Sequence, residues 1–297
     1  MKLKNLALSL GLALLASLPM AAQSEAPQTV YSFQTVDYTG DTFTQLLGIN
    51  NSNVIAGYHG ATVNKGFTYS LATKTFTNEN FPKSAQTQVI GINNKGKTSG
   101  FYIDAAGRTH GFTILGAAAN SVDLPTTTFN QLLSQNDFQQ AAGYYSTKAD
   151  GTGPDHAYVF NELGSVFETL TIPSSVSAQA TGINNSSSTC GFTVDAAGVN
   201  HGWLLVQGTF TILNFPGSTG TQALGLNNKG VVVGAYTDAS GNSHGFTYAI
   251  ASKTWQSIDD PNGVGTTLVN GINDAGILVG FSGTSPINNG FVAMPGS

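Results

Sequence analysis

The stretch GINNKGKTSGFYIDAAGRTHGF, residues 91–112, decides the fold because nearly the same phrase returns along the chain. It reads GINNSSSTCGFTVDAAGVNHGW from residue 182, GLNNKGVVVGAYTDASGNSHGF from residue 225 and GINDAGILVGF from residue 271. Alignment on the first position gives six copies, whose anchor residues are Gly48, Gly91, Ser134, Gly182, Gly225 and Gly271. Consecutive anchors are 43, 43, 48, 43 and 46 residues apart. One structural unit has therefore been repeated six times.

Each repeat carries strand signals and no helical periodicity, and a period of about 40 to 50 residues with that pattern is typical of propeller blades. Residues 221–261 show the unit clearly: strands are expected at 221–227, 231–238, 242–250 and 253–261, with Gly-containing turns between them. Four strands make one blade. The sequence therefore predicts an all-β, six-bladed β-propeller of four-stranded blades.

The two ends of the chain predict how the ring closes. The last copy stops after its third strand, whereas FQTVDYTG near the N-terminus matches FTILNFPG from residue 210. We expect residues 31–38 to complete the sixth blade beside residues 289–294, since a closed ring leaves no open strand edge.

The first residues have the features of an export signal. A short basic region, an apolar run and small residues precede a cleavage site expected near Ala22, so residues 1–22 are predicted to be a signal peptide. Residues 23–297 then form a single domain that is secreted, extracellular or periplasmic. Loss of Lys2 and Lys4 leaves 9 basic and 16 acidic residues, a net charge of −7, which disfavours nucleic acid as a partner. Cys190 is the one cysteine, so no intramolecular disulfide is expected.

The GINNxGxxxG phrase followed by an HGF or HGW element resembles the HAF-type repeat of secreted bacterial proteins, over essentially the whole mature chain. That resemblance implies export and a repeated β fold, and it implies no shared activity. The third copy departs from the pattern, because SQNDFQQAAG replaces the usual phrase and the stretch STKADGTGPDHAY lengthens a hairpin. The third repeat is therefore a candidate for specialisation.

Asparagine stands two positions after every anchor. These residues could form a ring of amides around a central channel, or each could cap the turn that ends the innermost strand. We expect the capping role, because all six copies have the same turn to build. The asparagines are Asn50, Asn93, Asn136, Asn184, Asn227 and Asn273.

Glutamine stands three positions before five of the anchors, and Leu268 replaces it in the sixth copy. These side chains are candidates for ligand binding at a channel mouth. Sequence drift at a purely structural position would also explain why the sixth copy lacks the glutamine. The glutamines are Gln45, Gln88, Gln131, Gln179 and Gln222.

Histidine stands two residues before an aromatic residue in four copies, at His110, His156, His201 and His244. The preceding hairpins place Asp104, Asp195 and Asp238 on the same face as three of these histidines, which predicts structural Asp to His hydrogen bonds. Repetition around a ring keeps the histidines apart, so no metal site is expected.

The longer hairpin of the third repeat supplies further candidates for ligand binding, namely Lys148, Asp150 and Asp155, because long loops on a rigid scaffold often carry recognition. No nucleophile elbow, HExxH or P-loop pattern occurs, and no catalytic residue or cofactor is predicted. We expect a monomeric, non-enzymatic binding module for a carbohydrate or a protein, without a membrane span. A hydrolase or lyase with a site at the channel mouth, and a structural envelope protein, are the alternatives.

Overall fold

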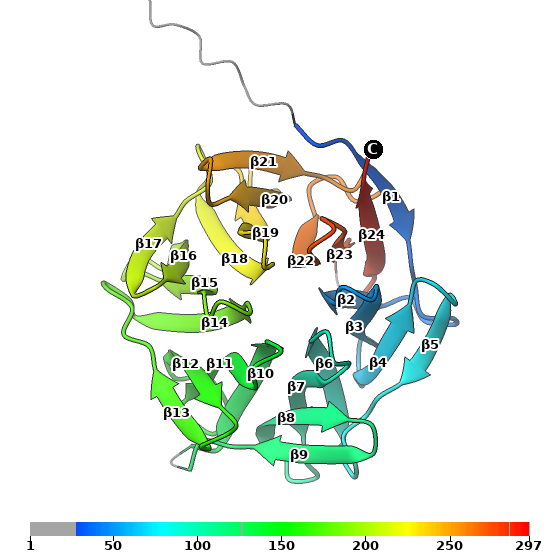
Figure 1. Ribbon diagram of the computed structural model, residues 1–297, viewed down its shortest axis with the longest axis vertical. Helices are drawn as coiled ribbons and strands as arrows, with labels where there is room; N and C mark the ends of the chain where they lie inside the picture. The colour runs from blue at the N-terminus through cyan, green and yellow to red at the C-terminus, as the bar shows by residue number, and fades with distance from the viewer. Residues whose placement is uncertain (1–27, 126, 285, 297) are drawn as a thin grey trace, which may run out of the picture.

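The computed structural model describes residues 28–125, 127–284 and 286–296, so the predicted signal peptide of residues 1–22 lies outside the described residues. Within these ranges the chain forms 24 β-strands and no helix. The strands are grouped like the blades of a propeller around a central opening (Figure 1). The all-β propeller predicted from the repeats is confirmed. In the described segments, no helix is long and apolar enough to cross a membrane.

Four of the five sheets contain four strands each, and in every one the strands run antiparallel from the central opening outward. The first repeat forms β2 (Thr44–Ile49), β3 (Val54–His59), β4 (Lys65–Ser70) and β5 (Thr75–Asn78). The fourth forms β14 (Ser177–Ile183), β15 (Thr189–Val194), β16 (Asn200–Val206) and β17 (Thr209–Leu213). The fifth forms β18 (Gly220–Leu226), β19 (Val231–Thr237), β20 (Ser243–Ala249) and β21 (Thr254–Ile258). The sixth combines β22 (Leu268–Ile272), β23 (Leu278–Ser282) and β24 (Asn289–Pro295) with β1 (Tyr31–Thr35).

The fifth sheet has eight strands and contains the second and third repeats. The second repeat forms β6 (Gln86–Ile92), β7 (Thr98–Ile103), β8 (Thr109–Leu115) and β9 (Ala118–Val122). The third forms β10 (Phe129–Gln135), β11 (Gln140–Ser146), β12 (Asp155–Asn161) and β13 (Val166–Thr169).

The predicted six four-stranded blades are seen as separate sheets for four repeats. The second and third repeats instead share one sheet, because a parallel pair between Phe129 and Thr109 joins β10 to β8. Similar parallel contacts link Phe43 to Asn288 and Ser243 to Thr266, but these remain isolated bridges between neighbouring sheets. Five hydrogen-bonded sheets result from this single additional pair.

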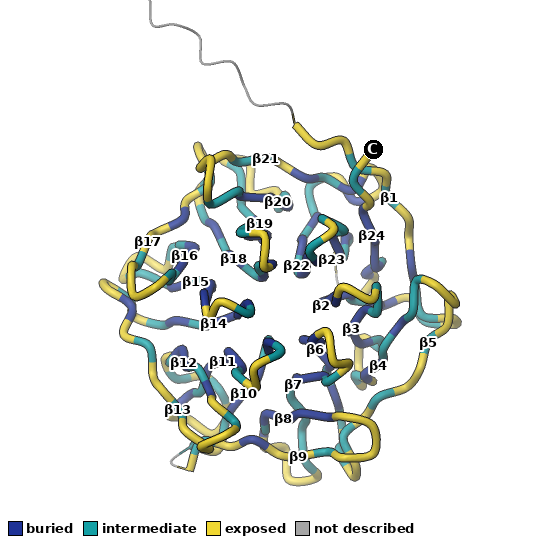
Figure 2. The backbone as a smooth tube through the Cα atoms, in the orientation of Figure 1, coloured by how far each residue is buried: buried dark blue, intermediate teal, exposed yellow. Residues whose placement is uncertain are grey.

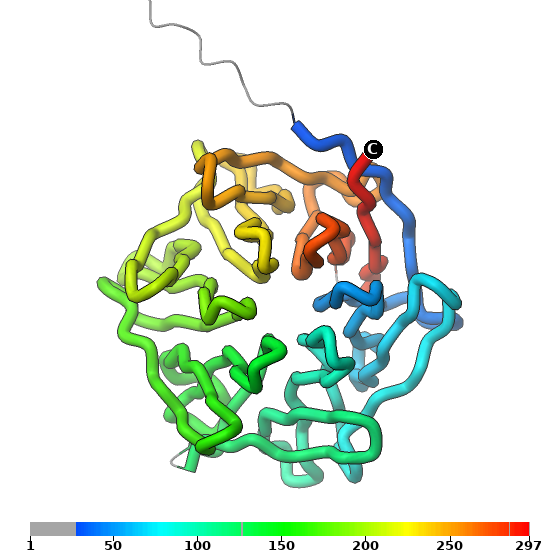
Figure 3. The backbone as a smooth tube through the Cα atoms, in the orientation of Figure 1, coloured from blue at the N-terminus to red at the C-terminus, as the bar shows by residue number. Residues whose placement is uncertain are grey.

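The closure predicted from the chain ends is confirmed. β1 pairs antiparallel with β24 in a register that places Phe33 opposite Ala293. The pairing extends at both ends, since the Val36 amide donates to the Gly290 carbonyl and the Gly296 amide donates to the Val30 carbonyl. The two ends of the described chain therefore lie side by side (Figure 3).

The innermost strands share a local irregularity that shapes the central opening. In each of them the pairing with the second strand skips the residue before the anchor, which is a β-bulge. The anchor itself lies against the next inner strand, because a Cβ on Gly48 would stand 2.6 Å from the Ile90 carbonyl oxygen. Glycine at this position thus permits the close approach of neighbouring inner strands.

The core lies between neighbouring repeats. Phe67 of the first repeat packs with Val279 and Val292 of the sixth, and the other repeat interfaces follow the same plan. Full burial of an aromatic side chain contributes roughly 1.5–3 kcal/mol, so this position is a main source of stability. The third strand of every repeat supplies one such side chain, exposed by 1% or less: Phe67, Phe112, Tyr158, Trp203, Phe246 and Phe291.

Candidate ligand-binding cavity

A cavity of about 330 Å³ occupies the centre of the propeller. The six inner strands and the turns that follow them line it, and those turns include exposed residues that surround the opening (Figure 2). Small-molecule sites typically have volumes of about 300–1,000 Å³, so this cavity is large enough for a small ligand.

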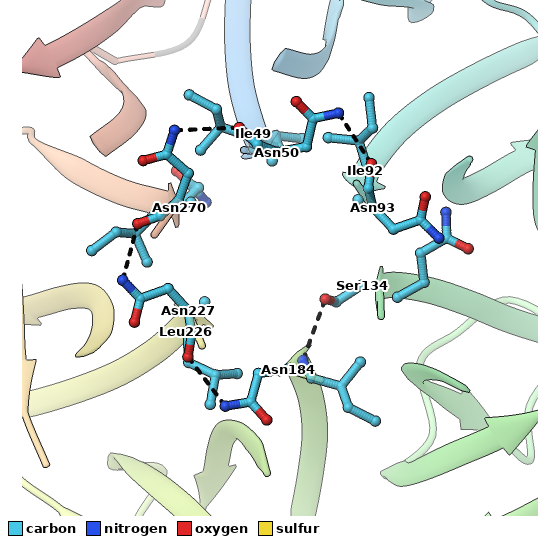
Figure 4. Close-up of a pocket in the computed structure, with 18 of the residues that line it drawn as sticks. Ile49, Asn50, Ile92, Asn93, Ser134, Asn184, Leu226, Asn227 and Asn270 are labelled. Atoms are coloured by element: carbon cyan, nitrogen blue, oxygen red, sulfur yellow. Dashed lines mark hydrogen bonds between the residues drawn. The ribbon is translucent and has the colours of Figure 1, made fainter. Parts of the chain in front are cut away.

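The buried asparagines form a closed ring in the wall of this cavity. The Asn184 side-chain oxygen accepts the backbone amides of Ser186 and Ser188, both at 3.0 Å, so it caps its own turn. Its amide group donates to the Asn227 carbonyl of the next repeat at 3.1 Å. All six asparagines donate in the same direction around the ring, and Figure 4 shows several of these bonds. The expected capping role is present, and the same amides also join neighbouring repeats.

A second ring, called here the rim, lies one residue further along each turn. It consists of Asn51, Asn94, Asp137, Asn185, Asn228 and Asp274. Each side chain accepts the backbone amide of the rim residue before it, at 2.8–2.9 Å, and the series closes from Asp274 back to Asn51. The rim therefore has fixed side-chain positions at one mouth of the cavity.

The two aspartates organise the amide groups of the rim. Asp137 accepts the side-chain amides of Asn94 and Asn185 at 2.8 and 2.7 Å. Asp274 accepts those of Asn51 and Asn228 at 2.7 and 3.0 Å. Four amide groups are thus oriented by two carboxylates.

Both rim carboxylates are held ionised. Partial burial raises the pKa of Asp137, but the amide donors of Asn185 and Asn94, together with the nearby Lys95 charge, outweigh it and leave the pKa lowered. The same balance lowers the pKa of Asp274, with Lys229 as the nearby cation. One lysine thus accompanies each carboxylate at the mouth.

Each rim asparagine retains hydrogen-bonding capacity. An asparagine side chain can donate two hydrogen bonds and accept two. Asn94, for example, donates one bond to Asp137 and accepts one from the Asn51 backbone amide. One N–H and one oxygen lone pair of Asn94 therefore remain for a ligand, among the contacts of the described residues.

Deeper in the cavity the bulged residues form a mostly apolar ring: Leu47, Ile90, Leu133, Thr181, Leu224 and Asn270. Thr181 donates to the Ala223 carbonyl at 2.8 Å. The buried side-chain oxygen of Asn270 has no hydrogen-bond partner among the described residues. The cavity therefore combines a polar mouth with a mostly apolar wall.

The predicted glutamine set does not act as one ring. Only Gln45 and Gln179 of the five line the cavity. Gln45 donates to Asn288 at 2.9 Å, Gln88 donates to Asn64 at 2.7 Å and Gln179 donates to Asp155 at 2.7 Å. These bonds connect the start of an inner strand to the preceding repeat, so three of the five glutamines join repeats.

The predicted Asp to His hydrogen bonds are confirmed. Asp104 contacts His110 at 3.3 Å, Asp195 contacts His201 at 3.1 Å and Asp238 contacts His244 at 3.3 Å. The other ring nitrogen of each histidine contacts a residue that follows the outer strand of the same repeat: Asp123, Asn214 or Asp259.

His156 stacks on Tyr145 at a ring-centroid distance of 5.0 Å, as His110 and His244 stack on the equivalent tyrosines. It differs from the other three histidines in having no side-chain hydrogen bond to an aspartate among the described residues. His201 and His244 favour the charged form. The bonds from Asp195 and Asn214 raise the pKa of His201, while burial lowers that of His244 less than Asp259 and Asp238 raise it. These pairs fasten strands within a repeat.

The long hairpin of the third repeat lies away from the rim. Ser146, which precedes the hairpin, is paired with Phe129 at the start of β10, whereas the rim turn follows the end of β10. Asp150 accepts from Thr152 within the hairpin, Lys148 is exposed, and half-buried Asp155 accepts from Gln179. The structure therefore does not bring Lys148 and Asp150 to the cavity.

Within the described residues, no three His, Cys, Asp or Glu side chains are placed to hold a metal ion. Cys190 is buried, and this burial raises the pKa of its thiol to about 12.

The rim residues and the bulged ring were not among the sequence candidates. A signal for the rim was present, because the residue after each capping asparagine is Asn in four repeats and Asp in the third and sixth. The bulge that turns the residue before each anchor toward the cavity leaves no comparable mark in the sequence.

No protein-family model matches this chain. No curated protein matches it. Among solved structures, a mutant Aleuria aurantia lectin in complex with Fucα1-6GlcNAc is similar at a TM-score of 0.54 and 9% identity, covering 86% of this chain and 96% of the lectin. The β-propeller domain of the Trilobed protease from Pyrococcus furiosus gives 0.55 and 8%, covering 86% and 96%.

A nidogen/laminin complex is also similar, with a TM-score of 0.51 and 14% identity over 77% of this chain and 84% of the other. At these identities the three similarities establish the propeller fold alone.

Proposed function

We propose that this protein is a secreted, non-enzymatic propeller that binds a neutral carbohydrate at the rim of its central cavity. The observation that carries the proposal is the closed rim, where two aspartates fix the amides of four asparagines around a cavity of about 330 Å³. Sugar hydroxyls both donate and accept hydrogen bonds, and the free N–H and lone pair of each rim asparagine match them.

Fixed donors and acceptors favour binding, because less side-chain entropy is lost when the ligand arrives. The charges at the rim favour a neutral ligand, since Lys95 lies near Asp137 and Lys229 lies near Asp274. Structural neighbours that include a fucose-specific lectin and a nidogen/laminin complex support a binding role for this fold.

The rim carboxylates support binding over acid catalysis. A general acid must carry a proton near the working pH. Asp137 and Asp274 have lowered pKa values, so both are ionised at neutral pH and serve as acceptors. The alternatives of a hydrolase or lyase at this mouth therefore receive no support from its two carboxylates.

We further propose that the two halves of the eight-stranded sheet act as separate blades, giving six blades in all. The support is that six capping asparagines make one closed ring with six equivalent bonds. Export by the signal at residues 1–22 and membership of the HAF-type repeat group remain part of this proposal, on the sequence patterns alone.

A printed array of neutral, acidic and basic glycans tests the function, using residues 23–297 and two matched variants. Leu133→Trp enlarges a side chain of the cavity wall, whereas Leu115→Trp changes an exposed residue at the end of β8, outside the cavity. We expect selective binding of neutral glycans by the unaltered protein and by Leu115→Trp, with at least about tenfold weaker binding by Leu133→Trp. Equal binding by all three proteins, or no glycan binding, contradicts the proposal. Capture of a protein ligand alone would favour a protein-binding module.

A further inference from the structure

The turn after β10 in the third repeat presents a large aromatic side chain beside the rim. Phe138 directly follows the rim residue Asp137 and is 62% exposed. The five equivalent turn positions hold small or charged residues: Ser52, Lys95, Ser186, Lys229 and Ala275. Phe138 is therefore the one large apolar side chain among the six equivalent turn positions.

The turn that carries Phe138 is fastened to the outer part of its own repeat. The residue after it, Gln139, has a φ of 63°, a left-handed conformation that glycine adopts more easily. The Gln139 carbonyl accepts the Glu162 backbone amide at 2.9 Å. Glu162 in turn forms an ion pair with Lys97 of the second repeat.

Both neighbouring repeats hold the same turn. From the second repeat, the Lys95 ammonium group donates to the Asp137 carbonyl at 2.7 Å. From the fourth, the Ser187 hydroxyl donates to the Gln140 side-chain oxygen at 2.7 Å. The same Gln140 oxygen also accepts the Asn136 side-chain amide. One departure of the third repeat from the common phrase, Gln140, thus helps to fix this exposed turn.

A second exposed apolar side chain lies on the adjoining turn. Leu163 follows Glu162 on the adjoining turn and is 77% exposed. Because Glu162 is bonded to Gln139, the turns that carry Leu163 and Phe138 are in contact. An aromatic ring on a rigid turn at the edge of a polar mouth is a suitable stacking surface for the C–H face of a sugar ring.

We propose that Phe138 is the stacking platform for a second sugar residue, so that the ligand is an oligosaccharide extending from the rim over the third repeat. This inference rests on the proposed carbohydrate binding at the rim and adds its length and direction. The ligand then leaves the mouth on one side only, because the corresponding turns of the other five repeats offer no aromatic ring.

The test compares ligands of increasing length. The probes are the methyl glycosides of fucose, galactose, glucose, mannose and N-acetylglucosamine, together with neutral di- to tetrasaccharides of the same sugars. Isothermal titration calorimetry on residues 23–297 compares the unaltered protein with Phe138→Ser, Phe138→Trp and Leu163→Ser. Serine is chosen because it occupies the Phe138 position in the first and fourth repeats.

We expect Phe138→Ser to weaken oligosaccharide binding about five- to tenfold, as the loss of one aromatic contact does. Binding of the methyl glycosides should stay within about twofold, and Phe138→Trp should retain oligosaccharide affinity. Oligosaccharide binding that Phe138→Ser leaves unchanged overturns the platform while the rim proposal stands. A Leu163→Ser loss equal to that of Phe138→Ser also overturns the assignment to Phe138. Failure of the unaltered protein to bind any probe overturns both proposals.

Discussion

Asp137 and Asp274 stand opposite each other in the rim, three repeats apart, and each accepts the side-chain amides of the two asparagines beside it. The sequence of rim residues around the mouth is therefore Asn-Asn-Asp, and it occurs twice. A ring of asparagines alone would place amide groups against one another at some contacts. The two carboxylates remove this conflict and set the orientation of every rim amide.

Asp137→Asn should lower the free energy of unfolding by about 1–2 kcal/mol at pH 7, because the new amide meets those of Asn94 and Asn185 in place of an acceptor. Urea denaturation measures this change, and Asp150→Asn in the exposed hairpin is the control. The folded pKa of Asp137 is lowered, so its contribution is present above the unfolded pKa of about 3.9 and is lost as the pH falls through the folded value. The variant and the unaltered protein should therefore converge in acid. A constant difference down to pH 2 would count against the carboxylate's role.

Asn184→Ala should destabilise the protein by about 2–3 kcal/mol, since it removes two turn bonds and the bond to the next repeat in a buried site. Asn184→Asp retains the acceptor that caps the turn, but it places a buried carboxylate oxygen against the Asn227 carbonyl, so we expect an equal or larger loss at pH 7. Chemical denaturation of the three proteins gives the comparison. Equal stability of Asn184→Ala and the unaltered protein would show that the inner ring is not a structural element.

The propeller fold could be predicted from the sequence because the same strand and turn signals recur in successive repeats. The Asn phrase marked the inner turn, the HGF element marked the third strand, and the incomplete last copy predicted the pairing of β1 with β24. The number of separate sheets could not be predicted. It depends on one residue pair, Phe129 with Thr109, which joins two strands here but is an isolated bridge at two equivalent places.

The candidate site was less accessible to sequence reasoning. The glutamines share one position in the repeat, but whether each lines the cavity depends on its hydrogen-bond partner. Gln88, for example, donates to Asn64 and does not line the cavity. The rim was not predicted because Asn and Asp are common in turns, so their presence there does not indicate a binding site. The length of the hairpin in the third repeat made it the candidate for ligand binding. The exposed Phe138 of the same repeat lies at the other end of β10.

The histidine pairs predict a second pH dependence, of opposite sign. The folded pKa values of His201 and His244 are raised, so their contribution to stability is fully present below the unfolded pKa of about 6.5 and is lost as the pH rises through the folded values. His201→Gln/His244→Gln should remove much of the stability difference between pH 5.5 and pH 8.5. Thermal denaturation at both pH values measures it, with His156→Gln as the control that lacks such an aspartate. An unchanged pH profile in the double variant would contradict the assignment.

The closure of the ring predicts a successful circular permutation. Val30 and Gly296 are hydrogen-bonded neighbours, so an Asn-Gly turn can join Gly296 to Val30 as a hairpin. With new ends between Asp150 and Gly151, the permuted chain should unfold within about 1 kcal/mol of the unaltered protein. A chain that lacks residues 28–35 should lose roughly 3 kcal/mol or more and associate through the exposed edge of β24. Urea denaturation and sedimentation measure both outcomes. A truncated chain of undiminished stability would show that β1 does not close the ring.

The most direct measurement of the central claim is a nuclear magnetic resonance titration of the asparagine side-chain amides with the neutral glycans of the array. Binding at the rim should shift the side-chain signals of Asn51, Asn94, Asn185 and Asn228, while signals near His110 and His244 stay in place. Saturating glycan that leaves those four amides unchanged, or that shifts only signals remote from the cavity, would contradict the account.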